Sequence, residues 1–225
     1  MTGAVSRQGE PSRDCPACPR LVAFRERWRE AEPAWHNAPV PSWSDPRGDD
    51  HVRLLIVGLA PGLRGANRTG RPFTGDYAGD LLYATLEKFG FAKGDYAADP
   101  SDWLTLRACA ITNSVRCVPP ENKPVGAEIG NCRMFLTPTI ARFRKLKAIL
   151  TLGRIAHEST LRALGVKLAQ APFSHGGASG IGEITVFSSY HCSRYNTNTN
   201  RLTTQMFEDV FAAIATQLGG IAHAR

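Results

Sequence analysis

One segment of the chain combines a permissive backbone with side chains that can bind a ligand. Residues 58–76 read GLAPGLRGANRTGRPFTGD, with five glycines, two prolines and three arginines. Glycine lets a backbone approach a ligand closely or adopt positive φ, and arginine binds anions. The segment lacks the Gly-Lys-Ser/Thr sequence of a P-loop, and its glycine spacing differs from the Gly-x-Gly-x-x-Gly dinucleotide motif. We expect a shaped ligand-binding loop; the alternative is a glycine-rich turn between a strand and a helix.

Four of the six cysteines lie in polar or proline-flanked segments, where they could bind a metal centre. Cys15 and Cys18 form a Cys-Pro-Ala-Cys pair, whereas Cys117 and Cys132 are far apart. Four thiolates can bind either a tetrahedral zinc ion or a cubane iron–sulfur cluster. A zinc ribbon usually has a second close cysteine pair, so the spacing favours the iron–sulfur cluster. Four unrelated thiols are the remaining alternative.

Hydrophobic patterns predict the elements that position these residues. Short apolar runs alternate with amphipathic helical patterns, which indicates a parallel sheet with helices on both faces. Three strand ends lead into residues 60–76, Asn113 and residues 191–200, so we expect these segments to meet at the carboxyl edge of the sheet. The expected strands are 53–59, 103–112, 147–152 and 184–190, and the expected helices are 21–32, 78–89, 127–143 (interrupted at Pro138), 155–164 and 202–218.

Length and composition indicate a single α/β domain over residues 15–225, preceded by a polar, disordered tail over residues 1–14. Residues 176–180 are expected to form a flexible, glycine-rich loop. The formal charge of +7 favours a polyanionic partner such as nucleic acid. We find neither an apolar signal segment nor an apolar run long enough for a membrane helix, so we expect a monomeric cytoplasmic protein that associates with the nucleoid and not with a membrane.

Four motifs, together with the four cysteines, carry a family resemblance. The motifs are GLAPG (58–62), GRPFTGD (70–76), TNSVRC (112–117) and HCSRYN (191–196). Several motifs in order are more specific than any one of them. On these residues the chain resembles the family 5 uracil-DNA glycosylases, or UDGb, from Cys15 to about the last predicted helix.

The resemblance implies a three-layer α/β/α fold with a central four-stranded parallel sheet. It also implies a [4Fe-4S] cluster on the four cysteines. The implied activity is excision of uracil, and of other deaminated bases such as hypoxanthine, from DNA in base excision repair. Related families carry a catalytic Asp or Asn where this chain has Ala60.

The chemistry of base excision suggests a role for each residue of the predicted pocket. An enzyme that acts on a base must flip it out of the duplex, and Phe73 is a candidate stacking platform. The Asn113 amide can pair with O4 and with N3–H of uracil. The resemblance adds Ala60 and Gly62 to the base-binding residues. Without the resemblance, Phe73 could equally be a core aromatic residue and Asn113 could cap the end of the strand.

Two residues are candidates for the bond-breaking step. His191 could donate a hydrogen bond to uracil O2 as negative charge develops on the departing base. Asp76 could orient the attacking water or stabilise the cationic sugar, since Ala60 offers no side chain for this task. Their structural alternatives are a hydrogen-bonding histidine at a strand end and an N-cap aspartate.

Residues 193–196 are the predicted DNA contacts. Ser193 and Asn196 could bind phosphates through their hydroxyl and amide groups, Arg194 could bind them through its charge, and Tyr195 could insert into the gap left by the flipped base. The alternative is a polar turn before a helix cap.

Two other function classes fit parts of the pattern. The basic charge and four cysteines also fit a non-catalytic nucleic-acid-binding module with structural zinc. The glycine-rich loop also fits a nucleotide-binding α/β enzyme.

Overall fold

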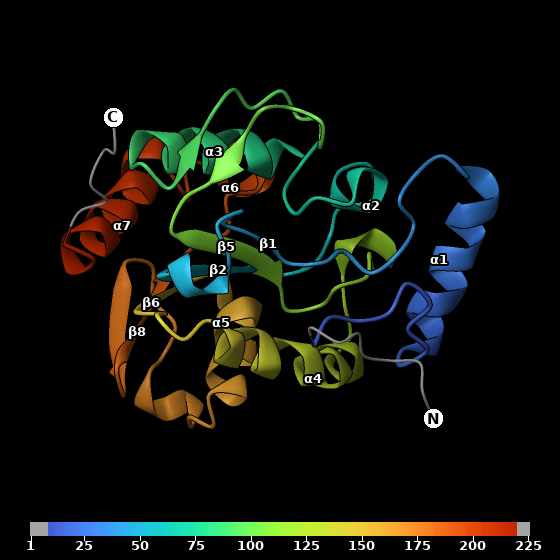
Figure 1. Cartoon of the computed structure of the whole chain (residues 1–225). Coiled ribbons are helices and arrows are strands. Elements are labelled where there is room, and N and C mark those ends of the chain that lie inside the picture. The colour runs from blue at the N-terminus through green and yellow to red at the C-terminus, as the bar shows by residue number, and fades with distance from the viewer. Residues whose placement is uncertain (1–8, 220–225) are drawn as a thin grey trace.

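A mixed six-stranded sheet forms the centre of the computed structural model, which describes residues 9–219 (Figure 1). Its four inner strands are parallel, in the order β5-β2-β6-β8. All five residues of β2, β5 and β6 are buried, as expected for parallel strands covered on both faces. The strands are β1 (Trp43–Ser44), β2 (Leu54–Gly58), β5 (Cys109–Asn113), β6 (Ala148–Leu152), β7 (Gly177–Ile181) and β8 (Ile184–Ser189).

Helices cover both faces of the sheet, which gives the three-layer α/β/α arrangement predicted from the sequence. Alternate residues of a strand point to opposite faces. Leu54 and Ile56 therefore belong to one hydrophobic core, which they share with α3 (Tyr77–Lys88) and α7 (Thr204–Gln217). Leu55 and Val57 belong to the other core, with α4 (Gly126–Arg142) and α5 (Arg154–Ala163). Figure 1 shows α3 and α7 above the sheet, and α4 and α5 below it.

Short elements complete the fold around this sandwich. Helix α1 (Pro19–Ala31) lies beyond one end of the sheet (Figure 1), and its Leu21 packs with Cys15 and Cys132 in a third hydrophobic cluster. The remaining α-helices are α2 (Ala66–Thr69) and α6 (Arg194–Asn198), and β3 (Ala92–Lys93) and β4 (Thr105–Leu106) form a separate two-stranded sheet. Three short 3-10 helices span Asp49–His51, Pro120–Asn122 and Leu168–Gln170.

The structure differs from the sequence-based prediction at both edges of the sheet. The four-stranded parallel sheet is extended by β1 and by β7, both of which pair antiparallel to their neighbours. Strand β7 occupies residues that we expected to form a flexible glycine-rich loop. Alternating intermediate and exposed residues in β7 explain why it has no apolar signature.

Other differences have local causes. The predicted strand 103–112 is two strands, because Ala108 adopts a positive φ of 52° and its N–H donates to the buried Asp45 carboxylate at 2.6 Å. Helix α4 continues through Pro138, where we expected an interruption. The loop expected after β8 contains α6. Ser193 caps this helix, and its Oγ accepts a hydrogen bond from the backbone N–H of Asn196.

Part of the predicted N-terminal tail is packed against the domain. Glu10 is buried, and its carboxylate lies 2.7 Å from the guanidinium of Arg116, whose side chain is itself 1% exposed. Buried charges are stable only when paired in this way. Residues 9–14 are therefore part of the fold, and residues 1–8 lie outside the described residues. Over residues 9–219, we find no helix that is both long and apolar enough to cross a membrane.

Candidate active site

A cavity of about 630 Å³ opens at the carboxyl ends of the parallel strands. This is where open α/β sheets bind their ligands. The register places Gly58 directly opposite Asn113, so that β2 and β5 end level with each other beside the cavity. The structure brings all six predicted catalytic and base-binding residues to its wall: Ala60, Gly62, Phe73, Asp76, Asn113 and His191.

Phe73 and Asn113 lie together over Gly58. A Cβ atom on Gly58 would clash with the Phe73 ring and with Asn113 Oδ1, so only glycine fits beneath them. Phe73 adopts a positive φ of 55°, which is uncommon for a bulky residue. The Asn113 side chain is buried, yet its Oδ1 has no hydrogen-bond partner among the residues described. An unpaired buried acceptor is unfavourable, and a donor on a bound ligand would satisfy it.

Asp76 points its carboxylate toward the glycine-rich loop. It occupies the N-cap position of α3, but its side chain makes no capping hydrogen bond. A Cβ atom on Gly62 or on Gly65 would clash with this carboxylate. Burial raises the pKa of Asp76 above its usual value of 3.8, although the Ala66 and Gly62 amides and Arg68 act against the shift. The glycines thus make room for a desolvated carboxylate, and the helix-capping alternative does not describe its side chain.

His191 follows β8, and its ring stacks beside the Phe73 ring in the wall of the cavity. The two ring centroids are 5.9 Å apart, with an interplanar angle of 25°. Burial lowers the pKa of His191 to about 4, so the imidazole is neutral at neutral pH. A neutral imidazole carries one N–H donor and one acceptor. His191 can therefore donate a hydrogen bond to a ligand without being charged.

The predicted DNA-contact residues occupy different positions. Ser193 and Arg194 line the cavity, and the Arg194 guanidinium lies 5.1 Å from the centre of the Tyr77 ring. Tyr195 is 72% exposed and does not line the cavity. Asn196 donates its amide to the His191 carbonyl at 2.8 Å, so this side chain helps to hold the loop that carries His191.

The cavity also contains residues that the sequence analysis missed. Gly153, Arg154 and Ile155 follow β6 and begin α5, and Asn122 approaches from the loop before α4. We predicted that three strand ends meet, whereas four do. The signal was present, because 147–152 was itself a predicted strand of the same parallel sheet.

Comparisons with known proteins assign the chain to a family. The family model of the uracil DNA glycosylase superfamily matches residues 46–215. A type-5 uracil-DNA glycosylase of Thermus thermophilus is 40% identical over 214 residues, which cover 92% of this chain and 94% of the relative. The chain belongs to the type-5 uracil-DNA glycosylases. Its similarity extends to a type-5 enzyme of Mycobacterium leprae, at 41% identity with 92% of each chain covered, and to one of Pyrobaculum aerophilum, at 36% with 92% and 90% covered.

The cavity of this type-5 uracil-DNA glycosylase contains a single carboxylate among its described lining residues. Ala60 contributes only a methyl group to the cavity. Among the lining residues that the structure describes, Asp76 is the one carboxylate. It reaches the cavity from the start of α3, sixteen residues after Ala60 in the sequence.

The four predicted metal-binding cysteines line one small cavity between α1 and α4. They come from three separate parts of the chain: Cys15 and Cys18 precede α1, Cys117 follows β5, and Cys132 lies in α4. Burial, and the neighbouring cysteine sulfurs, raise the pKa of Cys117 to about 12. Over residues 9–219, no three His, Cys, Asp or Glu side chains are arranged to hold a single metal ion.

Proposed function

We propose that the protein is a DNA glycosylase that flips uracil out of DNA, hydrolyses its N-glycosidic bond and leaves an abasic site for base excision repair. The observation that carries this proposal is the buried, unpaired Asn113 Oδ1 beside Phe73 in the cavity of a type-5 uracil-DNA glycosylase. The named activity of the relatives supports the same reaction.

Uracil recognition would satisfy the unpaired acceptor. In uracil, N3–H is a donor and O4 an acceptor, so the Asn113 amide can pair with both, whereas cytosine presents the opposite pattern at these atoms. Phe73 would stack on the base, and its ring already lies over Gly58 and beside the His191 ring before the base arrives. Preorganisation of this kind reduces the entropy lost on binding.

Bond cleavage separates charge between the base and the sugar. Neutral His191 would donate to uracil O2 as negative charge grows on the departing base, because a preorganised donor stabilises that charge. Asp76, when ionised, would orient the attacking water or stabilise the positive sugar from the opposite end of the reaction. Because burial raises the pKa of Asp76, its carboxylate is also a stronger base than an exposed one.

The size of the cavity supports a second, finer proposal about the substrate. A volume of about 630 Å³, with only a methyl group at Ala60, leaves room for a base larger than uracil. Other deaminated bases such as hypoxanthine are therefore included among the proposed substrates.

We further propose that Cys15, Cys18, Cys117 and Cys132 hold a [4Fe-4S] cluster. Their convergence on one cavity from three parts of the chain supports this assignment. The cluster would join the N-terminal segment, the segment after β5 and α4, and so contribute to folding free energy. We assign it no part in the hydrolytic step.

Single-turnover cleavage of DNA with one labelled uracil tests the function. Parallel substrates carry hypoxanthine or thymine at the same position. Abasic product from uracil and none from thymine is the expected result, and product from hypoxanthine would support the broader substrate range. No abasic product from iron-containing protein would instead favour a non-catalytic DNA-binding module.

A further inference from the structure

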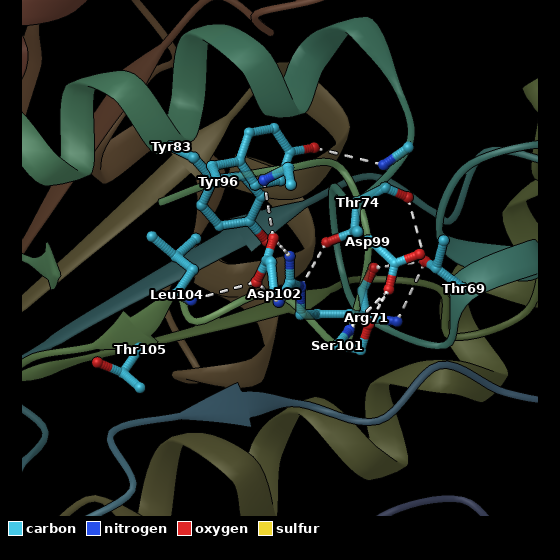
Figure 2. A network of polar contacts seen from close by, with 12 residues as sticks. Thr69, Arg71, Thr74, Tyr83, Tyr96, Asp99, Ser101, Asp102, Leu104 and Thr105 are labelled. Carbon is cyan, nitrogen blue, oxygen red and sulfur yellow. Dashed lines mark hydrogen bonds and ion pairs between the residues drawn. The ribbon is translucent and has the colours of Figure 1, made fainter. Parts of the chain in front are cut away.

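The loop that carries Phe73 and Asp76 is fixed by a buried network centred on Arg71. The Arg71 guanidinium makes two hydrogen bonds to the Asp102 carboxylate, at 2.6 and 2.7 Å. The side chains of Arg71 and Asp102 are only 7% and 3% exposed. Figure 2 shows the two groups facing each other. This bidentate geometry fixes the orientation as well as the distance of the pair.

Arg71 makes two further types of contact within this network, a hydrogen bond and contacts with aromatic rings. Its Nε donates to Thr74 Oγ1 at 2.7 Å, which closes the turn around Phe73. Its guanidinium lies over the Trp43 ring, 4.7 Å from the centroid. It also lies within 6 Å of the Tyr83 and Tyr96 rings. The planar guanidinium thus stacks and hydrogen-bonds at once, which a lysine could not do.

Two tyrosines hold the backbone of the same loop. The Tyr96 hydroxyl donates to the Phe73 carbonyl at 3.2 Å and accepts from the Gly75 amide at 3.3 Å. The Tyr83 hydroxyl donates to the Pro72 carbonyl. Gly79 of α3 has no side chain, and a Cβ there would clash with the Phe73 carbonyl and with the Tyr96 hydroxyl. The peptide groups on both sides of Phe73 are therefore anchored.

Asp102 also organises the segment that supplies Tyr96. Its carboxylate accepts from the Ala97 amide at 3.0 Å and from the Leu104 amide at 3.2 Å. Figure 2 shows Asp102 between Arg71 and Leu104, with Tyr96 beside Tyr83. Residues 96–104 thus form a support that contacts the catalytic loop but contributes no residue to the cavity wall.

Phe73 needs such a support because its backbone conformation is unfavourable. A positive φ in a bulky residue persists only where surrounding contacts enforce it. Three residues further on, Asp76 is aligned with Gly62 and Gly65 by the same stretch of backbone. Loss of the support would therefore move both the proposed stacking platform and the proposed carboxylate.

We propose that Arg71, Asp102 and Tyr96 are positioning residues that hold Phe73 and Asp76 in their reactive arrangement. This inference rests on the proposed function of Phe73 and Asp76. None of the three residues lines the cavity or belongs to the predicted DNA contacts at 193–196. Their loss should lower the rate of base excision and leave DNA affinity nearly unchanged, because the error arises only at the reacting atoms.

Asp102→Asn is the first test, because it removes the charge and keeps the size of the side chain. Small misplacements at a reacting centre can cost about 100-fold, so we expect the single-turnover rate to fall about 10- to 100-fold. The dissociation constant for DNA should change less than about threefold, since the DNA-contact side chains do not touch Asp102. Hydrogen exchange of the peptide spanning residues 70–76 should become faster.

Two further variants make the test decisive. Tyr96→Phe removes only the hydroxyl and keeps the ring, so it replaces Asp102→Asn if that variant does not fold. Glu208→Gln is the matched control, because it also neutralises one ion-paired carboxylate, in the Lys88–Glu208 pair between α3 and α7. The control should keep both the rate and the exchange of residues 70–76.

Each outcome has one meaning. Slower excision with faster loop exchange and retained DNA affinity supports the positioning role. A wild-type rate in folded Asp102→Asn and Tyr96→Phe, or an equal loss of DNA affinity, overturns it. If the wild-type protein excises no base, the proposed function fails, and the exchange of residues 70–76 still decides whether this network holds the loop.

Discussion

Asn113 shows how a buried side chain can favour function over stability. Its Oδ1 has no partner among the described residues, so truncation removes an unsatisfied acceptor from the free protein. Asn113→Ala should therefore leave the free energy of unfolding within about 1 kcal/mol of the wild-type value. The single-turnover rate on uracil should fall by about 10- to 100-fold, because one or two hydrogen bonds to the base are lost. Urea unfolding and a cleavage assay measure the two effects.

Asn37 is the matched control for this variant. It is equally buried, but its amide donates to the Trp28 and Glu32 carbonyls and its Oδ1 accepts from Asn67. Asn37→Ala should lower stability and retain the excision rate. Full excision by Asn113→Ala would contradict its role in reading uracil.

His191 gives a prediction about pH. Burial lowers its folded-state pKa to about 4, from an ordinary value of 6.5. The neutral form, which is the proposed donor, is then populated throughout the range from about pH 5 upward. Titration of His191 should therefore produce no inflection near pH 6.5 in the excision rate. The pH profiles of wild type and His191→Ala should have the same shape in this range. The variant should slow cleavage more than it weakens DNA binding; equal losses in both would indicate a residue that only positions DNA.

At the scale of elements, the sequence predicted what hydrophobic patterning determines. The four parallel strands, with buried residues such as Ile56 and Leu150, were identified because both of their faces are covered. The break at Ala108 was not, because a carboxylate contributed by Asp45, far away in the sequence, fixes that turn. Strand β7 was missed because it has no apolar pattern of its own. It is a strand because it pairs with β8.

The site follows the same division. The ordered motifs identified Phe73, Asn113 and His191. Asn113 and His191 directly follow predicted strands, and Phe73 lies in the loop after another. The ion pair of Arg71 with Asp102 joins residues 31 positions apart and has no sequence pattern. Only the folded chain shows that Asp102 supports the loop that carries Arg71.

The segment after β5 connects the base pocket with the cysteine cavity. Asn113 ends the strand and lines the active site, and Cys117 follows four residues later beside Cys132. Cys117→Ser should therefore remove the proposed cluster and destabilise the fold together. We expect less bound iron, weaker absorbance at about 400 nm and a lower unfolding midpoint.

Cys109→Ala provides the control for Cys117→Ser. Cys109 is buried in the main core and donates its thiol to the Phe91 carbonyl, away from the four cysteines. This variant should lose some stability and keep its iron. A colourless, stable and active Cys117→Ser protein would exclude the cluster as a structural element.

For the molecule as a whole, one buried carboxylate should contribute to acid sensitivity. Asp45 directly follows the edge strand β1 and is buried. Burial alone would raise its pKa, but hydrogen bonds from Arg47 and from the Ala108 amide lower it to about 2. The folded-state pKa is thus below the value of 3.8 for the unfolded chain. Asp45 therefore stabilises the fold above about pH 4, and this contribution disappears as the pH falls toward 2.

Asp45→Asn should remove this contribution at neutral pH. The free energy of unfolding of the variant should therefore fall less steeply as the pH is lowered from 4 to 2. The lowering of the pKa from 3.8 to about 2 corresponds to about 2 kcal/mol, so urea unfolding of Asp45→Asn at pH 7 should give a free energy of unfolding lower by about that amount. The two proteins should converge as the pH approaches 2, since the wild-type carboxylate is then protonated. Glu183→Gln, in the exposed pair with Lys147, should change stability little at any pH. Parallel curves for wild type and Asp45→Asn from pH 7 to 2 would show that the acid sensitivity arises elsewhere.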